Sequence, residues 1–160
     1  MPLLSRRTFV ISTAALASLP PGLALASEHT VEMLTRSATD PKLSNIFEPR
    51  LLVVQPGDTV LFAPTEKGHN SASIKGMIPE GAEAWNGRIN QEVAVTFDKP
   101  GYYGYKCTPH LALGMVGLVV VEGDGKLDNL EAAKAVKQRG RAKQAFEAIW
   151  AEADTQGLTA

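Results

Sequence analysis

Short runs that alternate apolar and polar residues fill the chain from about residue 30 to residue 121. In EVAVTF, the side chains of Val93, Val95 and Phe97 fall on one face, which is the period-two pattern of a half-buried strand. Five further short segments also predict strands, either by alternation of polar and apolar residues or by runs of β-branched and aromatic residues: residues 29–34, 50–55, 58–63, 101–107 and 116–122. Because Pro and Gly interrupt these runs regularly, the pattern favours an all-β fold, an antiparallel sandwich or barrel, over a parallel α/β sheet.

The composition changes after residue 125. Residues 126–160 are rich in Ala, Lys, Glu and Gln and contain no Pro. Asp128, with Glu131 three positions later, predicts a helix start of the capping-box type, and Gly140 separates two predicted helices. In the second helix, an apolar stripe is formed by Phe146, Ile149 and Trp150. We therefore expect a C-terminal helical extension that packs on a sandwich made by residues 27–125.

Residues 1–26 have the features of a cleaved signal peptide. A basic start precedes an apolar stretch, and the segment ends in Ala24-Leu25-Ala26, the small-x-small pattern that signal peptidases require. The apolar stretch is too short to anchor the chain in a bilayer. The pair Arg6-Arg7 resembles the twin-arginine export signal, with an ordinary secretory leader as the alternative. Either route places a mature chain that starts at Ser27 outside the cytoplasm.

The 134 residues that follow this leader are enough for one domain with its own core. They carry 14 basic and 17 acidic residues, which gives a net charge of −3 once the two leader arginines are removed. This balance excludes a globally basic nucleic-acid binder, and no second apolar span would hold the mature chain in a membrane. We expect a soluble monomer.

Cys107 is the only cysteine, so the chain cannot form an internal disulfide. Outside the cytoplasm a free thiol is open to oxidation unless it is buried or bound to a metal. His110 and Met115 follow Cys107 in the spacing C-x2-H-x4-M, on the loop between two predicted strands. One loop can therefore present a thiolate, an imidazole and a thioether toward one point. His69, which follows the predicted strand 58–63, is the best placed second imidazole.

A Cys, two His and a weakly bound Met form the ligand set of a blue-copper electron-transfer site. His29 stands outside any motif and is expected at the surface. Three alternatives remain: each residue is a separate packing residue, the ligands belong to a copper chaperone or store, or a Cys-His pair serves a Cys-dependent enzyme with Asn70 or Asp98 as its orienting group. Zinc is disfavoured because Met is a poor zinc ligand. Met115 would have no role in a Cys-dependent enzyme, and we therefore expect an electron carrier that is not an enzyme.

Longer motifs extend this interpretation over nearly all of residues 27–160. They are Phe47–Pro49 (FEP), Pro56–Val60 (PGDTV), Lys67–Asn70 (KGHN), Ile74–Glu83 (IKGMIPEGAE), Arg88–Asn90 (RIN) and Tyr105–Val121 (YKCTPH…GMVGLVVV). In these motifs and in its C-terminal helices, the chain resembles the pseudoazurins, small periplasmic type 1 blue-copper proteins of the cupredoxin family. The resemblance implies a cupredoxin Greek-key β-sandwich with two C-terminal α-helices and one type 1 copper per chain. The metal ligands that it implies are His69, Cys107, His110 and Met115. It also implies that Asn70 ties the two ligand loops together.

The resemblance further implies a role in electron transfer to a denitrification reductase in the periplasm. Copper nitrite reductase is the first expected partner, and nitrous oxide reductase or a c-type cytochrome is the next. Partners would dock near His110, whose ring edge is expected to emerge through an apolar collar. The collar residues are Pro109, Leu111, Leu113 and Met77, and the basic residues around it are Lys67, Lys106, Arg36 and Arg88. Such positive charge would steer an acidic partner toward the site.

Several positions at this surface depart from the pattern of the pseudoazurins. Asn86 replaces a usual lysine, and Leu111 and Leu113 stand where an aromatic residue and a methionine are usual. The segment Ser37–Asn45 is a few residues longer. We expect these departures to affect the choice of partner and not the binding of copper.

Overall fold

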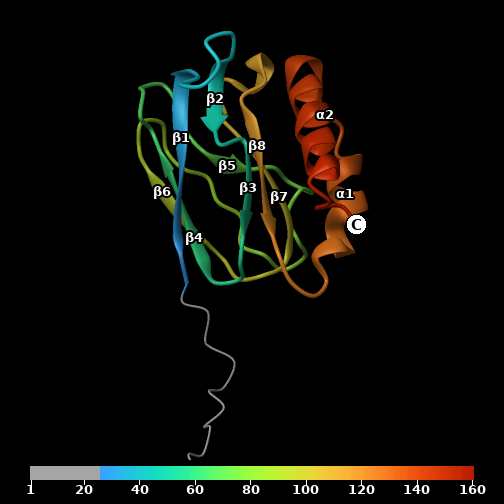
Figure 1. The fold of residues 1–160 in the computed structure, drawn as a ribbon. Helices are drawn as coiled ribbons and strands as arrows, with labels where there is room; N and C mark the ends of the chain where they lie inside the picture. The colour runs from blue at the N-terminus through green and yellow to red at the C-terminus, as the bar shows by residue number, and fades with distance from the viewer. Residues whose placement is uncertain (1–25) are drawn as a thin grey trace, which may run out of the picture.

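The structure is a computed structural model that describes residues 26–160, so residues 1–25 of the predicted leader lie outside it. Within the described residues, two four-stranded sheets pack face to face (Figure 1). The first sheet has the order β2-β1-β4-β6, with bounds Ser44–Glu48, Glu28–Arg36, Asp58–Ala63 and Val93–Phe97. The second has the order β3-β8-β7-β5, with bounds Leu51–Val54, Val116–Val121, Gly101–Lys106 and Ala72–Ser73. Two helices, α1 (Leu130–Ala135) and α2 (Gly140–Thr155), pack beside the second sheet, and short 3-10 turns form at Leu111–Leu113 (η1) and Lys126–Asn129 (η2).

This arrangement confirms the predicted β-sandwich with two C-terminal helices. The six predicted strands are β1, β3, β4, β6, β7 and β8. Most neighbouring strands are antiparallel, as expected, but β1 pairs with β4 and β3 pairs with β8 in parallel. The parallel pairs arise because the chain crosses between the sheets after β2 and again after β3, so β3 and β4 both pair with strands that are not adjacent to them in the sequence.

The core between the two sheets is rich in aromatic residues. Its rings belong to Phe47, Phe62, Trp85, Phe97, Tyr103 and Tyr105. Phe47 and Phe62 approach the Tyr105 ring edge-on, with ring centroids 4.7 Å and 4.9 Å away. Such edge-to-face pairs add about 0.5–1.5 kcal/mol each beyond the area that they bury. Cys107 and Met115 belong to this same buried cluster, so the candidate ligands rest on its rigid packing.

A second core lies between the second sheet and the helices. Phe146 and Ile149 of α2 are buried there, and the ring of Trp150 packs 5.7 Å from that of Tyr102 on β7. The predicted apolar stripe is therefore a packing face.

The predicted capping box is wrong, because Asp128 lies in η2 and makes no cap bond to α1. Asn129 side-chain atoms instead bond the backbone N–H and C=O of Tyr102, which attaches this segment to β7.

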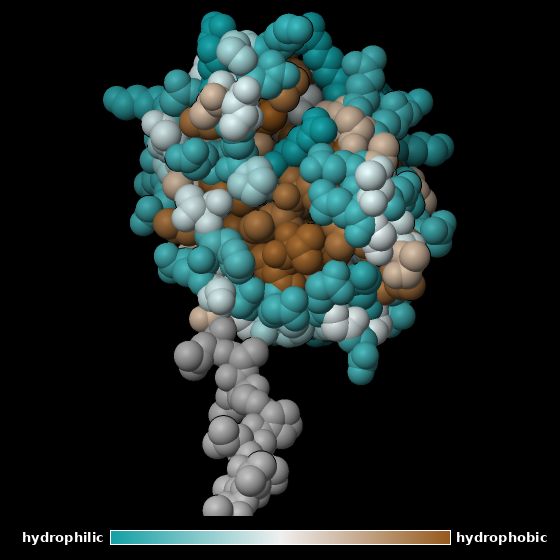
Figure 2. All heavy atoms as spheres, in the orientation of Figure 1, coloured by the Kyte–Doolittle hydropathy of each residue, from teal (hydrophilic) through white to brown (hydrophobic). Residues whose placement is uncertain are grey.

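The sandwich has one open side. β2 pairs with β1 only from Glu32 to Arg36, after which the chain crosses to β3 in the other sheet. The residues of β1 before Glu32 pair with β4 on one side and have no strand on the other. Figure 2 shows hydrophobic side chains gathered in a hollow on this face, and Leu52 and Val53 of β3 are half-buried.

No helix among the described residues is long and apolar enough to cross a membrane.

The hydroxyl of Tyr105 is buried with no hydrogen-bond partner among the described residues. Burial raises the pKa of this hydroxyl, and a buried polar group without a bond costs free energy. The Tyr105→Phe variant should therefore increase the free energy of unfolding by about 1 kcal/mol, measured by urea denaturation. Tyr102→Phe is the matched control, because its hydroxyl donates to the Leu158 carbonyl at 2.5 Å and its loss should destabilise the fold. Equal destabilisation by both variants would contradict this account.

Candidate metal centre

His69 is held by the segment that follows β4. The N–H of Asn90 donates to the His69 carbonyl at 2.9 Å, and the Asn90 side chain accepts a bond from the N–H of Gly68 at 2.6 Å. Gly68 has φ of +97°, which favours glycine at this turn. The hydroxyl of Thr35 on β1 lies 3.1 Å from Nε2 of His69. A hydrogen bond at that nitrogen orients the ring and leaves Nδ1 free to face the site.

Cys107, His110 and Met115 lie on one loop between β7 and β8. The N–H of Cys107 donates to the Met115 carbonyl at 3.0 Å, which closes the base of the loop. The N–H of His110 donates to the Cys107 carbonyl, and the N–H of Met115 donates to the His110 carbonyl, each at 3.2 Å. Gly114 has φ of +90°, and a Cβ there would lie 3.1 Å from the Arg141 carbonyl of α2. The helix therefore supports the back of the loop.

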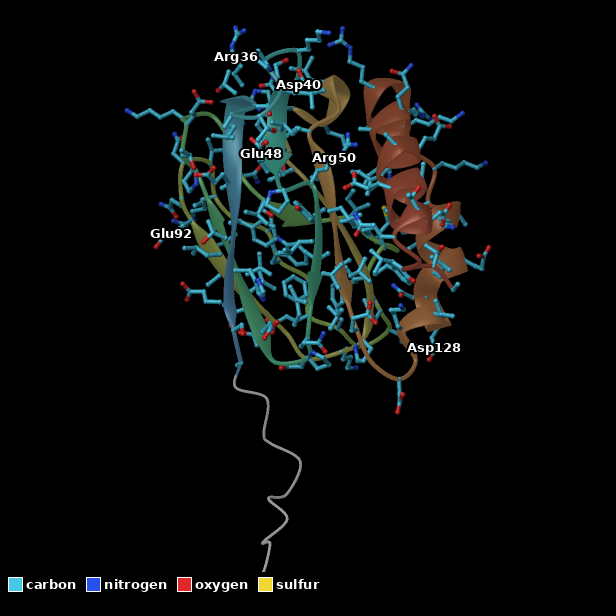
Figure 3. The ribbon with its side chains drawn as sticks, in the orientation of Figure 1. Arg36, Asp40, Glu48, Arg50, Glu92 and Asp128 are labelled. Carbon is cyan, nitrogen blue, oxygen red and sulfur yellow. The ribbon has the colours of Figure 1, made fainter. Side chains whose placement is uncertain are left out.

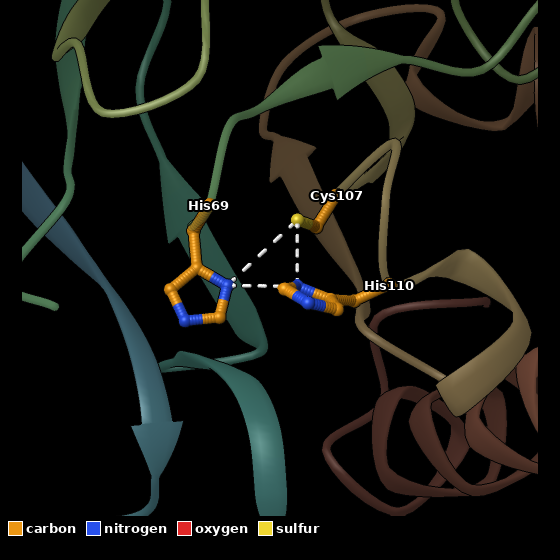
Figure 4. Close-up of side chains that lie close together, drawn as sticks. All are labelled: His69, Cys107 and His110. Atoms are coloured by element: carbon orange, nitrogen blue, oxygen red, sulfur yellow. Dashed lines mark hydrogen bonds between the residues drawn. The ribbon is translucent and has the colours of Figure 1, made fainter. Parts of the chain in front are cut away.

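The side chains of His69, Cys107 and His110 converge on one point (Figure 4). Nδ1 of His69 lies 3.0 Å from Nδ1 of His110. The Cys107 sulfur lies 3.9 Å from the first of these nitrogens and 3.5 Å from the second. Met115 is fully buried in the same cluster as Cys107, while His110 is half-buried. The four predicted site residues thus come from one end of the sandwich, although Met115 is placed here by its burial and its loop contacts.

Burial controls the protonation of these groups. Desolvation, followed by the nearby ring of His110, lowers the pKa of His69 and favours the neutral imidazole that a metal needs. Burial also raises the pKa of the Cys107 thiol, although the backbone N–H groups of Asn70 and His110 act in the opposite direction. Without a metal this thiol is not an activated nucleophile, because reactive cysteines combine a low pKa with exposure to solvent. A bound metal reverses the balance, since a coordinating thiol is deprotonated.

The donor set fits a copper ion. The three donor atoms lie 3.0 Å, 3.5 Å and 3.9 Å from one another, separations that atoms bonded to one ion at about 2.0–2.3 Å can have. A thiolate and a thioether favour Cu(I), and imidazole is also a good copper ligand. Two imidazoles, one thiolate and a distant methionine form the ligand type of a blue-copper site.

Asn70 connects the two ligand segments, as the sequence predicted. Its side-chain oxygen accepts a bond from the N–H of Thr108 at 2.7 Å, and its amide nitrogen donates to the Gly87 carbonyl at 2.9 Å and to the Thr108 hydroxyl at 3.2 Å. Thr35, Thr108 and Asn90 were missed by the sequence analysis. Their signal is weak because each acts through a partner at least 22 positions away.

The surface around His110 differs from the predicted collar in one residue. Leu113 is 45% exposed and Pro109 is exposed, but Met77 is 1% exposed and packs against Gly104 in the second core. Of the predicted basic residues, Arg36, Lys67 and Arg88 are exposed and Lys106 is half-buried. Figure 3 shows Arg36 projecting from the end of the sandwich where η1 lies. His29 is also not a simple surface residue, since its Nε2 lies 2.9 Å from a carboxylate oxygen of Asp58.

Comparisons with known proteins agree with this chemistry. Residues 33–122 match the family of copper-binding proteins described as plastocyanin/azurin. The chain is 43% identical over 147 residues to a pseudoazurin of Methylorubrum extorquens, covering 92% of this chain and 96% of that protein. It is 41% identical over 141 residues to a pseudoazurin of Paracoccus pantotrophus, covering 88% of this chain and 92% of that protein. The crystal structure of pseudoazurin from Methylobacterium extorquens AM1 superposes with a TM-score of 0.72 at 45% identity, covering 78% of this chain and 98% of that one.

Proposed function

The chain belongs to the plastocyanin/azurin family of copper-binding proteins, among the pseudoazurins, and from this premise we propose that it carries single electrons to a denitrification reductase in the periplasm. Members of this family are blue-copper electron carriers and not enzymes. We assign His69, Cys107 and His110 as the strong copper ligands and Met115 as the weak fourth ligand. Copper held there supplies a Cu(II)/Cu(I) couple that accepts and releases one electron.

The observation that carries this proposal is the convergence of one buried sulfur and two imidazole nitrogens within 4.8 Å. The ligand loop is held by its own backbone bonds, and its base is continuous with β7 and β8. Thr35 fixes the His69 ring, and Asn70 fixes the distance between the two ligand segments. Rigid ligands limit the atomic rearrangement that accompanies electron transfer, which supports a carrier.

The burial of the ligands argues against the two other functions. A copper chaperone needs ligands that an incoming partner can reach, but His69 and Cys107 are both 0% exposed. A Cys-dependent enzyme needs an accessible thiolate and an orienting group for its base. Asn70 is occupied by Thr108 and Gly87, and Asp98 lies beyond β6, in the turn before β7 begins.

The half-buried His110 is the proposed exit for the electron. The other imidazole, His69, has no exposure, so a partner can approach the centre most closely through His110. The exposed Leu113 lies three residues beyond it and offers an apolar contact. We infer that copper nitrite reductase docks here first, with nitrous oxide reductase or a c-type cytochrome as other partners.

We also infer that residues 1–26 are a cleaved leader that directs the chain to the periplasm. The domain then divides into a sandwich of residues 27–125 and a helical extension of residues 126–160, acting as a monomer.

A spectrum tests the proposed site. Purified protein loaded with Cu(II) should be intensely blue, because charge transfer from a thiolate to copper absorbs visible light strongly in sites of this kind. Ascorbate should bleach the colour by reduction to Cu(I), and an oxidant should restore it. A colourless Cu(II) complex would overturn the assignment of Cys107 as a ligand.

Reversing one charge at the proposed docking surface should slow electron transfer to copper nitrite reductase. Lys106 lies directly before Cys107, and Lys106→Glu should lower the second-order rate about three- to tenfold at low ionic strength, with a smaller difference at high salt. Stopped-flow loss or gain of the blue colour measures the rate. Lys99→Glu is the matched control, since it makes the same change in net charge at the opposite end of β7. Equal effects of the two variants would reject this docking surface.

A further inference from the structure

A second buried polar cluster lies at the end of the sandwich opposite the candidate metal centre. Asp58, the first residue of β4, is 4% exposed. Its carboxylate accepts bonds from the backbone N–H of Ser27 at 2.8 Å and from that of Gln55 at 2.9 Å, and it lies 2.9 Å from Nε2 of His29. A buried carboxylate needs such partners, because burial without them disfavours its charged form.

These bonds keep Asp58 ionised. The N–H of Gln55, then that of Ser27 and the ring of His29 lower the pKa of Asp58 to about 2. The carboxylate is therefore a fixed negative charge at any pH near neutrality. The backbone N–H of Ser27 lies 2.8 Å from this carboxylate. The attraction between the two groups becomes stronger if the donor nitrogen becomes positively charged.

Ser27 is the first of the described residues whose backbone is hydrogen-bonded to the sandwich. Its N–H binds Asp58, and its carbonyl accepts a bond from the N–H of Thr59 at 2.9 Å. Ala26 and Ser27 are both exposed, and β1 begins at the next residue. The bond between Ala26 and Ser27 is also the one that the small-x-small pattern predicts for cleavage. The nitrogen that cleavage would release is thus the nitrogen that Asp58 already binds.

We propose that the Ala26–Ser27 bond is the processing site and that Asp58 is the acceptor for the α-ammonium group formed at Ser27. Hydrolysis adds water across this bond: the hydroxyl goes to the carbonyl carbon of Ala26, which leaves as a carboxylate, and the Ser27 nitrogen takes up protons to become an ammonium. Its bond to the Asp58 carboxylate then changes from one donated by a neutral amide N–H to one donated by a charged ammonium, which is an ion pair. Removal of the leader therefore stabilises the domain that it releases. This inference rests on the proposed leader and is independent of copper.

Three forms of the chain test the ion pair without any substitution in the fold. They are residues 27–160 with a free amine, the same residues with an acetylated Ser27, and residues 24–160, whose amine lies three residues away. Each contains every strand and helix of the described fold, since β1 begins at Glu28 and α2 ends at Thr155. At pH 6.5 the α-amine is protonated, because its ordinary pKa is about 7.7–8.0. The free-amine form should have an unfolding equilibrium constant about five- to tenfold smaller than either other form, measured by urea denaturation.

Asp58→Asn, made in all three forms, completes the test. The advantage of the free-amine form should disappear, because the amide carries no charge to pair with the ammonium. Equal stability of the three unsubstituted forms, or the same advantage with Asp58→Asn, would overturn the ion pair. Mass spectrometry of the protein exported from cells that express the whole sequence should show a chain that begins at Ser27, and a different start would overturn the processing site. The blue colour should be the same in all forms, so its loss would speak against the copper assignment and not against this inference.

Discussion

Cys107→Ser should abolish the blue colour of the copper-loaded protein and lower its electron-transfer rate to a reductase by more than about 100-fold. The hydroxyl of serine is not a thiolate, so the charge-transfer absorption is lost and Cu(I) loses its best ligand. Changes in residues that merely support ligands already cost about 10–100-fold in metal affinity or activity, and loss of a ligand should cost more. Absorption spectra at saturating Cu(II) and stopped-flow rates measure the two effects.

The fold should survive this substitution. Cys107 is buried at the end of β7, and its N–H keeps its bond to the Met115 carbonyl in the variant. Metal-free Cys107→Ser should therefore retain the circular dichroism of the unsubstituted protein. Met77→Leu is the matched control, because it also removes a buried sulfur but lies in the second core. If Met77→Leu loses its colour as well, or if metal-free Cys107→Ser unfolds, Cys107 is mainly a packing residue.

Asn70→Ala should lower the free energy of unfolding by about 3 kcal/mol and weaken copper binding about 10–100-fold. The side chain of Asn70 is 3% exposed and joins two loops that are far apart in the sequence. Alanine removes three part-buried hydrogen bonds, to the N–H and the hydroxyl of Thr108 and to the carbonyl of Gly87, and such bonds contribute about 0.5–1.5 kcal/mol each. Urea denaturation and competition with a copper chelator measure the two losses.

The Thr108→Ala variant distinguishes two contributions of Asn70: its bond to the Thr108 N–H and its bond to the Thr108 hydroxyl. It removes only the 3.2 Å bond from the Asn70 amide to the Thr108 hydroxyl and keeps the shorter bond to the Thr108 N–H. We expect a loss below about 1 kcal/mol and little change in copper affinity. If Thr108→Ala is as damaging as Asn70→Ala, the bridge between the loops does not depend on the backbone.

The strands that the sequence predicts best are those with a strong local pattern. β4 alternates buried and half-buried residues, β6 alternates less exposed and exposed residues up to the buried Phe97, and β8 is an unbroken apolar run. β2 was missed because its five residues lack this alternation, and β5 because it has only two residues. The sequence also did not predict the two parallel strand pairs, because strand pairing depends on contacts between segments that are distant along the chain.

The candidate site was predictable in part. The spacing of Cys107, His110 and Met115 is local, and His69 is the best placed second histidine, directly after a predicted strand, so the convergence of the sulfur with two imidazoles could be expected. The contact of Thr35 with His69 could not, because nothing in β1 marks that threonine. For Asp128 a local pattern gave a wrong prediction. The sequence predicts a helix cap there, but in the structure the neighbouring Asn129 is bonded to the backbone of β7 and α1 has no side-chain cap.

The direction of β7 has a practical use in electrochemistry. The strand begins beside Lys99 and ends beside Cys107, and its six residues span about 20 Å. Because the only native cysteine is buried, Lys99→Cys would provide the single accessible thiol of the described domain. Attachment of that thiol to a gold electrode would immobilise every molecule with His110 facing the solution. The current would then report directly on the arrival of a soluble partner at that end of the protein.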